Sequence, residues 1–215
     1  MTESATGLIL RARPLTETSL IIHWLTPDLG RIATVAKGAR RARSPFAGKL
    51  DLFYLADFSF NRSRRSDLHT LREASLRETH GAIRQDIYKL RHAAYATAFI
   101  EQATETETPL PAVYELLRAF LGCLCNGKPA PQLIFALELK LLLELGLAPD
   151  LAETNLAAGT KKIAGILMQN DWINAWRLKL TDGQTAELQQ FLHGFLICHL
   201  GRLPRGRAAA LAGAA

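Results

Sequence analysis

The sequence predicts an α+β protein in which a small five-stranded β barrel is followed by an all-α helical domain. Two observations carry this prediction. In residues 1–80, short apolar runs alternate with turn residues, and the best run repeats with a period of two. After residue 80 the apolar residues recur every three or four positions, which is the spacing of a helix face. The predicted division is a barrel domain over residues 1–80, a helical domain over 81–205 and a disordered tail over 206–215.

The strands of the barrel are separated by turn signals. Pro27-Asp28-Leu29-Gly30, for example, has typical turn chemistry. In residues 50–60 the even positions are mostly apolar, whereas several polar residues fall on the other face, so this strand is expected to bury one face. Five short strands in about 75 residues fit a closed barrel of the OB type. The strands are expected at residues 7–13, 19–26, 31–37, 50–60 and 68–74.

The helical half divides at prolines and glycines. A first helix carries apolar residues from Ile83 to Ala98, and a second runs from near Pro111 to Asn126. A helix over 132–145 is apolar nearly all round, which predicts that it lies at the centre of the helical core. Beyond a loop expected at 150–159, further helices are predicted at residues 163–168, 173–180 and 185–200.

Composition excludes several classes of protein. The 215 residues are 48% hydrophobic, which is enough apolar surface to exclude a wholly disordered chain. The most hydrophobic stretch, residues 133–147, is interrupted by three charges, so no membrane span is expected. Residues 1–7 lack the pattern of a signal peptide, and three cysteines are too few for a disulfide framework. A cytoplasmic location is therefore expected.

Positive charge is concentrated at the two ends of the chain. The formal net charge is +6, from 26 Lys and Arg against 20 Asp and Glu. Residues 1–80 carry a net charge of +5, residues 81–160 carry −3 and residues 161–215 carry +4. A segregated excess of this kind indicates a face that meets a polyanion.

We find no catalytic motif in the sequence. It has no phosphate-binding Walker loop, no dinucleotide-binding glycine fingerprint and no Cys-x-x-Cys pair. Cys123 and Cys125 lie two positions apart on a predicted helix and point in different directions, so they are expected to pack rather than to bind one ion. Glu105 and Glu107 read as part of a solvated loop. The sequence therefore predicts a protein that is not an enzyme and has no cofactor or metal.

Two basic connections stand out as candidate phosphate-binding sites. The first is residues 37–49, which contain five basic residues and no acidic one, and the second is the turn around residues 62–65. Phe46, inside the first, and Phe53, on the opposite strand face from the apolar row, are candidate surfaces for base stacking, with Trp24 and His69 as weaker ones. The alternatives are a merely solvated loop and aromatic rings that pack in the core. The predicted cations are Lys37, Arg40, Arg41, Arg43, Lys49, Arg62, Arg64 and Arg65, with Arg11, Arg13 and Arg72 in second rank because strand residues also serve as internal ion-pair partners.

Several short stretches follow one another in a recognisable order. They are GLILR at 7–11, ETSL at 17–20, VAKGARR at 35–41, LREA at 71–74, RQDI at 84–87, LGLAP at 145–149 and HLGR at 199–202. In this order they resemble the RecO family of bacterial DNA repair proteins, and the resemblance spans nearly the whole chain.

The resemblance implies a non-enzymatic recombination mediator of the RecFOR pathway. Such a protein binds single- and double-stranded DNA, anneals complementary strands and helps to load RecA on DNA coated with the single-stranded DNA-binding protein SSB. It implies RecR and the acidic C-terminal tail of SSB as partners, no membrane, and a cytoplasmic, nucleoid-associated location. The tail is expected in a helical groove whose candidate rim residues are Arg91, Arg118 and Lys140.

Residues 151–162 depart from the RecO pattern, and two other functions can be weighed against the same sequence. Many relatives carry a zinc-binding cysteine cluster after the central helix, but residues 151–162 contain no cysteine, which predicts that no structural zinc is bound. A basic OB barrel also suits a general RNA- or DNA-binding module without annealing activity. A nuclease is disfavoured because the sequence shows no clustered acids for a divalent metal.

Overall fold

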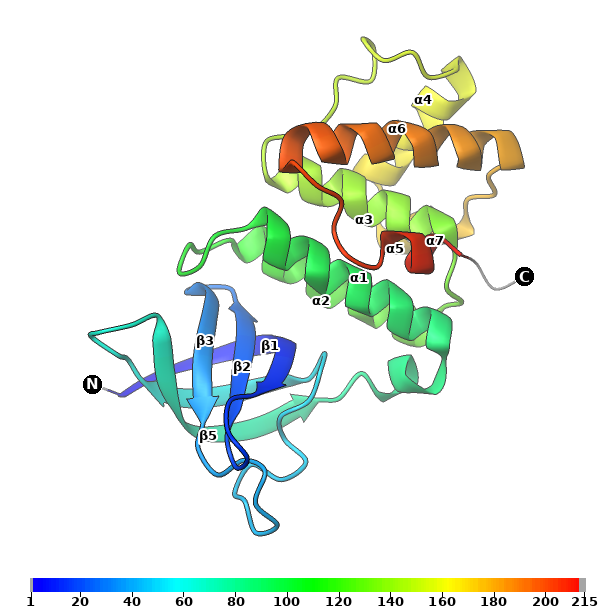
Figure 1. Ribbon diagram of the computed structural model, residues 1–215. Coiled ribbons are helices and arrows are strands. Elements are labelled where there is room, and N and C mark those ends of the chain that lie inside the picture. Colours follow the sequence, from blue (N-terminus) through cyan, green and yellow to red (C-terminus); the bar gives the residue numbers. More distant parts are fainter. Residues whose placement is uncertain (1, 213–215) are drawn as a thin grey trace. The chain divides into compact units, whose positions relative to one another are not determined.

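The computed structural model describes residues 2–212. The chain divides into two compact units, which we treat separately. The barrel unit contains the residues up to His80 together with Thr104–Arg118, and the helical unit contains Gly81–Ala103 together with the residues from Ala119 onward. The predicted α+β fold class is confirmed, with five strands followed by helices (Figure 1).

The five strands form a closed barrel in the order β1-β2-β3-β5-β4. Neighbouring strands are antiparallel except for β3 and β5, which run parallel over only three residue pairs, from Ala33 to Val35 on β3. This is the five-stranded arrangement expected of an OB-type barrel. The strands are β1 (Thr2–Pro14), β2 (Leu20–Thr26), β3 (Gly30–Ala36), β4 (Leu55–Asn61) and β5 (Leu68–Glu78).

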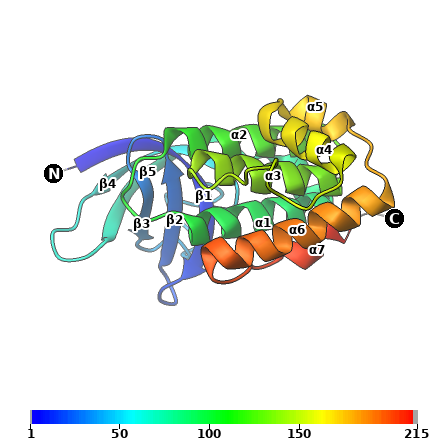
Figure 2. The same ribbon diagram turned by 90° about the horizontal axis from the view of Figure 1, so that it is seen from above.

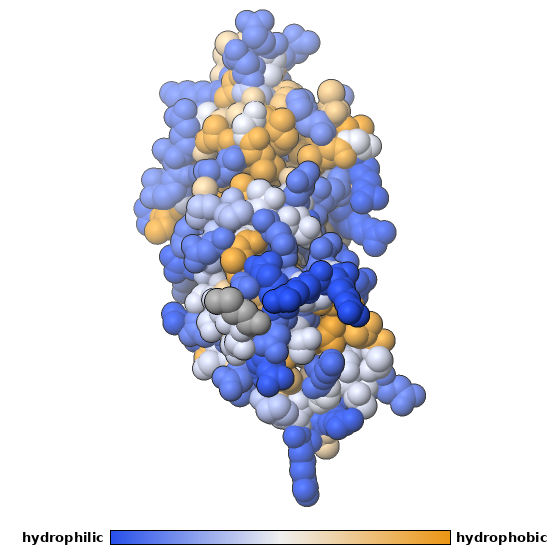
Figure 3. Space-filling model, turned by 90° about the vertical axis from the view of Figure 1, so that its left-hand side faces the viewer, coloured by the Kyte–Doolittle hydropathy of each residue, from blue (hydrophilic) through white to orange (hydrophobic). Residues whose placement is uncertain are grey.

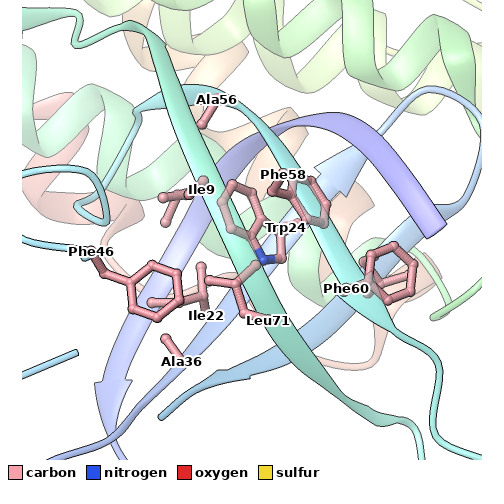
Figure 4. Packing of buried hydrophobic residues seen from close by; sticks show 11 residues of the cluster. Ile9, Ile22, Trp24, Ala36, Phe46, Ala56, Phe58, Phe60 and Leu71 are labelled. Carbon is pink, nitrogen blue, oxygen red and sulfur yellow. The ribbon is translucent and has the colours of Figure 1, made fainter. Parts of the chain in front are cut away.

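Alternating side chains build the barrel core, as the period of two predicts. Buried and half-buried residues alternate strictly along β3 and β4. Trp24 stacks on Phe58 with ring centroids 4.0 Å apart, and its indole N–H donates to the buried hydroxyl of Thr34 at 2.9 Å. Figure 4 shows these rings side by side inside the barrel. The hydrogen bond satisfies the one polar atom that burial of a tryptophan brings into the core.

Strand β4 begins five residues later than predicted. Phe53 has a φ of 66°, in the left-handed region that interrupts a strand, and its backbone N–H donates to the carbonyl of Ile9 at 2.9 Å. Because of this turn Phe53 lies inside the protein, at 2% exposure, instead of on the outer face of a strand. The expectation that the Phe53 ring is exposed and can stack on a base was therefore wrong.

A return segment, Thr104–Thr108, completes the barrel unit. Thr106 forms a parallel bridge with Arg31 of β3, and the N–H of Glu107 donates to the carbonyl of Arg31 at 2.9 Å. A Cβ at Gly30 would lie 2.0 Å from the carbonyl oxygen of Thr108, so only glycine permits this approach. The prediction that the barrel domain ends at residue 80 was therefore incomplete, because periodicity within a segment does not show that the segment pairs with a distant strand.

The helical unit is organised around helix α3 (Pro131–Glu144). Nine of its residues are buried, and it packs against α4, α5, α6 and α7, which confirms its predicted central place (Figures 1 and 2). After a short 3-10 helix at Gly81–Gln85, the helices of the chain are α1 (Ile87–Ala103), α2 (Pro111–Asn126), α3, α4 (Ala158–Gln169), α5 (Trp172–Arg177), α6 (Asp182–Leu200) and α7 (Arg207–Leu211). No helix within residues 2–212 is long and apolar enough to cross a membrane.

Part of the predicted disordered tail is instead a helix. Residues 207–211 form α7, and Arg207 is 5% exposed. Its guanidinium donates to both carboxylate oxygens of Glu138 at 2.7 and 3.0 Å, and the hydroxyl of Tyr95 donates to the same carboxylate at 2.5 Å. This buried network fixes α7 against α1 and α3. Residues 213–215 of the predicted tail lie outside the described residues.

Candidate nucleic-acid interface

The basic segment, residues 37–49, consists of successive turns between β3 and β4. Backbone N–H groups of Arg41, Ser44, Ala47 and Lys49 each donate to the carbonyl three residues earlier, at 3.1–3.2 Å. Gly38 has a φ of 70°, which permits the first of these turns. A chain of turns on the surface presents its side chains outward. Accordingly, Lys37, Arg40, Arg41 and Arg43 are exposed and Lys49 is half-buried.

Arg40 differs from its neighbours because it holds the connection between β1 and β2. Its backbone N–H donates to the carbonyl of Thr18 at 3.0 Å, and its guanidinium donates to the carbonyl of Thr16 at 3.1 Å. A pocket of about 430 Å³ lies where this connection meets the basic segment, and Lys37 and Arg41 line it. Two cations and neighbouring hydroxyl groups around one hollow form a suitable place for a phosphate.

The aromatic side chains predicted to stack on bases are all buried. Phe46 is 6% exposed and belongs to the barrel core, where it points toward Ile22 and Leu71 (Figure 4). Trp24 and His69 are 0% and 1% exposed. The prediction that Phe46 stacks on bases was therefore wrong, and the alternative that these rings pack inside the protein is confirmed, because burial of an aromatic ring stabilises the core.

Arg62 is engaged by the protein's own carboxylates. Its guanidinium contacts both oxygens of Glu3, at 2.8 and 3.1 Å, and one oxygen of Glu107 at 3.0 Å. The hydrogen bonds that Arg62 donates to Glu3 lower the pKa of Glu3 and raise the pKa of Arg62. The same Glu107 oxygen lies 2.9 Å from Nε2 of His69, whose Nδ1 accepts from the N–H of Ser63. Arg62 is thus occupied by two carboxylates, and its predicted contact with DNA stays a prediction.

The remainder of the β4–β5 turn is exposed. Arg64 and Arg65 are exposed and form no ion pair with any residue in the described range 2–212. Figure 3 looks toward this turn and shows a group of strongly hydrophilic side chains on this part of the barrel. Arg64 and Arg65 therefore present two unneutralised cations to an incoming polyanion.

The second-rank cations lie in mixed surroundings. Arg11 and Arg13 are exposed on β1. Arg72 of β5 and Lys49 together line an open pocket of about 640 Å³, which Asp57 and Glu73 also line. Opposite charges so close together make this pocket a weaker place for a phosphate than the hollow beside Lys37.

The three predicted groove residues have separate environments. Arg91 lies over the ring of Tyr88 at 5.5 Å, and Arg118 pairs with Glu115 one helical turn away at 2.8 Å. Lys140 donates to the carbonyls of Met168 and Asn170, at 3.1 and 2.5 Å, where α4 ends. Burial lowers the pKa of the Lys140 ammonium. Each of the three side chains thus has partners of its own, and their role in binding the SSB tail stays a prediction.

A pocket that the sequence analysis missed lies between α2 and α5 in the helical unit. It has a volume of about 490 Å³ and is lined mainly by apolar groups, among them Trp172, Ile173 and Trp176. Ile173 is 57% exposed, and the ammonium of Lys140 lies 5.6 Å from the centre of the Trp172 ring. We name this the tryptophan pocket. The signal in the sequence was the pair of tryptophans four positions apart, which places them on one helix face.

No group of three His, Cys, Asp or Glu side chains within residues 2–212 is arranged to hold a metal ion. The absence of a structural zinc stays a prediction.

Comparison with known proteins identifies the family. The family description "Recombination protein O N terminal" matches residues 1–80, and "Recombination protein O C terminal" matches residues 84–155. The chain belongs to the RecO family. The RecO N-terminal match coincides with the strands of the barrel, and the RecO C-terminal match ends before α4. The resemblance stated from the sequence is confirmed.

Several proteins named DNA repair protein RecO are similar to this chain. The one from Bacillus pumilus is 29% identical over 206 residues, which cover 92% of this chain and 79% of the relative. Those from Exiguobacterium sibiricum and Anaeromyxobacter sp. are 33% and 34% identical over 70% and 68% of this chain. The matched part of this chain spans 60% and 58% of these two RecO proteins, which is less than two thirds of their length.

Proposed function

We propose that this RecO-family protein is a non-enzymatic recombination mediator that binds single- and double-stranded DNA and anneals complementary strands. The observation that supports this most directly is a set of exposed cations on the barrel unit. Lys37, Arg41 and Arg43 come from the basic segment, and Arg64 and Arg65 come from the β4–β5 turn. Cations that neutralise phosphates release counterions, which gives an affinity that is independent of sequence and dependent on salt.

Annealing follows from the same electrostatics. Two strands of DNA repel each other, and this repulsion extends over about 10 Å at 0.1 M salt. A surface that neutralises phosphates on both strands lowers the cost of bringing them together. Base pairing then supplies the specificity, so the protein needs no base-reading side chains. The burial of Phe46 and Phe53 is compatible with this, because a phosphate-binding surface does not depend on aromatic stacking.

Within this proposal the protein acts on DNA coated with SSB, together with RecR, so that RecA is loaded. We assign the acidic tail of SSB to the tryptophan pocket. Apolar walls suit the apolar end of the tail, and Lys140 lies beside Trp172. Lys140 supplies a positive charge near the pocket without lining it, whereas Asp171 lines the pocket and is a charged neighbour of Lys140.

Annealing of labelled complementary oligonucleotides tests the proposed function. The reaction contains no nucleotide or metal and is run with bare and SSB-coated strands at about 50 and 200 mM salt. We expect annealing that is fast at low salt and slower at high salt, on both substrates. Tight binding to RNA without annealing would support the general nucleic-acid-binding module instead. Shortened products would contradict the non-enzymatic assignment.

Binding of a fluorescent SSB-tail peptide tests the pocket. Ile173→Glu places a negative charge in the lining and is expected to abolish peptide binding, because it repels the acidic tail. Ile197→Glu is the matched control, since Ile197 is 41% exposed on α6 and does not line the pocket. Equal binding by the two variants would contradict the assignment.

A further inference from the structure

Arg62 stands at the start of the basic β4–β5 turn, yet its charge is more than neutralised by its neighbours. Glu3 holds it with two contacts from β1, and Glu107 holds it with one contact from the return segment. One positive and two negative charges meet here. These three side chains together carry a net negative charge, two residues along the chain from Arg64.

The three side chains are accessible to a competing anion. Their exposed fractions are 35% for Arg62, 28% for Glu3 and 41% for Glu107. Partly exposed ion pairs are weak and are screened by salt, so the carboxylates hold Arg62 by proximity and geometry rather than by burial. The guanidinium also lies over the ring of Phe60 at 5.9 Å, which fixes the direction of the side chain.

Glu107 is itself held in place by several contacts. It has a φ of 55°, its N–H is bonded to the carbonyl of Arg31, and its carboxylate contacts Nε2 of His69, which is buried. His69 stacks on Phe60, with ring centroids 5.2 Å apart. These contacts with the barrel hold the Glu107 carboxylate in the position where it binds Arg62.

We propose that Glu3 and Glu107 withhold Arg62 from nucleic acid and so reduce by one the number of phosphates that the barrel neutralises. This inference rests on the proposed function, because it concerns the same DNA-binding surface. The two glutamates act as determinants of affinity and salt sensitivity without touching DNA. A phosphate that approaches Arg62 therefore also meets two carboxylates.

The test compares salt slopes for binding of a fluorescent oligo(dT) strand. The variant is Glu3→Gln with Glu107→Gln, which frees Arg62 and keeps the shape of both side chains. The control is Glu17→Gln with Glu105→Gln, which removes the same charge from exposed glutamates that pair with no residue in the range 2–212. Glu17 lies next to the basic segment, so the control also reports any general charge effect.

We expect the slope of log affinity against log salt to steepen by about 0.7 in the variant and to stay unchanged in the control. Between about 50 and 200 mM salt this adds about 2.6-fold to the loss of affinity. Adding Arg62→Gln to the variant should restore the wild-type slope. An equal change in variant and control, or a steeper slope that survives Arg62→Gln, would overturn the inference.

Two further readouts separate the possible failures. If the double variant does not fold, as judged by its melting transition, Glu3→Gln alone removes the two-pronged contact and is expected to give an intermediate slope. An unchanged slope in that folded variant overturns the inference. A wild-type protein that binds oligo(dT) without salt dependence overturns the proposed function itself, and the inference falls with it.

Discussion

Arg207 and Glu138 form a two-pronged ion pair in the core of the helical unit, 69 residues apart in the sequence. Arg207 is 5% exposed and Glu138 is fully buried. Removal of one partner from such a pair leaves a buried charge without compensation. This contact makes the C-terminal helix α7 part of the core.

Arg207→Ala is therefore expected to lower the free energy of unfolding by about 3–5 kcal/mol. The measurement is urea denaturation followed by circular dichroism. Arg205→Ala, on the exposed side of the same stretch, is the matched control and should change stability by no more than about 0.5 kcal/mol. A loss below about 1 kcal/mol in Arg207→Ala would contradict the structural role of α7.

Substitution of Lys37, Arg41 and Arg43 together by Ala is expected to reduce the salt slope for single-stranded DNA by about 2, because each phosphate contact contributes about 0.7. Binding to all sequences should weaken alike. Arg40→Ala should act differently, because the Arg40 guanidinium is bonded to the carbonyl of Thr16. It should loosen the neighbouring connection with a smaller change in slope. Fluorescence anisotropy over a salt series measures both, and an unchanged slope in the triple variant would place the basic segment away from the phosphates.

Phe46→Ala is expected to lower the free energy of unfolding by about 3–5 kcal/mol and to leave the salt slope for DNA unchanged, because the ring packs in the barrel core. Thermal or urea denaturation and DNA titration give the two readouts. Phe46→Leu, which keeps most of the apolar volume, is the conservative control. Loss of DNA affinity in a variant of normal stability would restore the stacking role.

Acid is expected to weaken the attachment of α4 to α6. The carboxylate of Glu187 accepts a hydrogen bond from the hydroxyl of Thr160 and another, of 2.6 Å, from the N–H of Ala157. Both bonds lower the pKa of Glu187 below the ordinary value of 4.5, and the bond from Thr160 has the larger effect. A carboxyl group whose pKa is lowered by folding stabilises the fold at pH values above its ordinary pKa. This stabilisation is lost as the pH falls through the lowered pKa of the folded state. Melting temperatures from about pH 6 to 3 should fall less steeply in Glu187→Gln than in the wild type. Parallel curves would show that Glu187 does not hold α4.

Local pattern was sufficient for the fold class and insufficient for much of the site. Alternation in residues 50–60 and the apolar helix predicted over 132–145 predicted the barrel and the centre of the helical unit, because both signals lie within one segment. The partners of Arg62 lie 59 and 45 residues away in the sequence, so the residues around Arg62 give no signal that predicts these ion pairs. Phe46 was misplaced for a similar reason, since a polar loop that folds back over a barrel looks like a solvated loop in sequence.

The helical end of the chain shows the same limit. The short alanine-rich helix α7 has no amphipathic pattern that would predict it from the sequence. It is held in place by the ion pair between Arg207 and the distant Glu138. Likewise α4 begins at Ala158, within the loop expected at 150–159, because Glu187 of another helix binds its first turn. Contacts of this kind are visible only in three dimensions.

The bridge between Arg31 and Thr106 bears on how this protein can be dissected. A fragment that stops at His80 would keep all five strands but would lose the segment that lies against the first half of β3. The amide groups there would become an open sheet edge, which invites pairing with other chains. Truncation studies should therefore keep Thr104–Arg118 together with the five strands, although a family boundary drawn on the sequence falls at residue 80 and the intervening Gly81–Ala103 belongs to the helical unit.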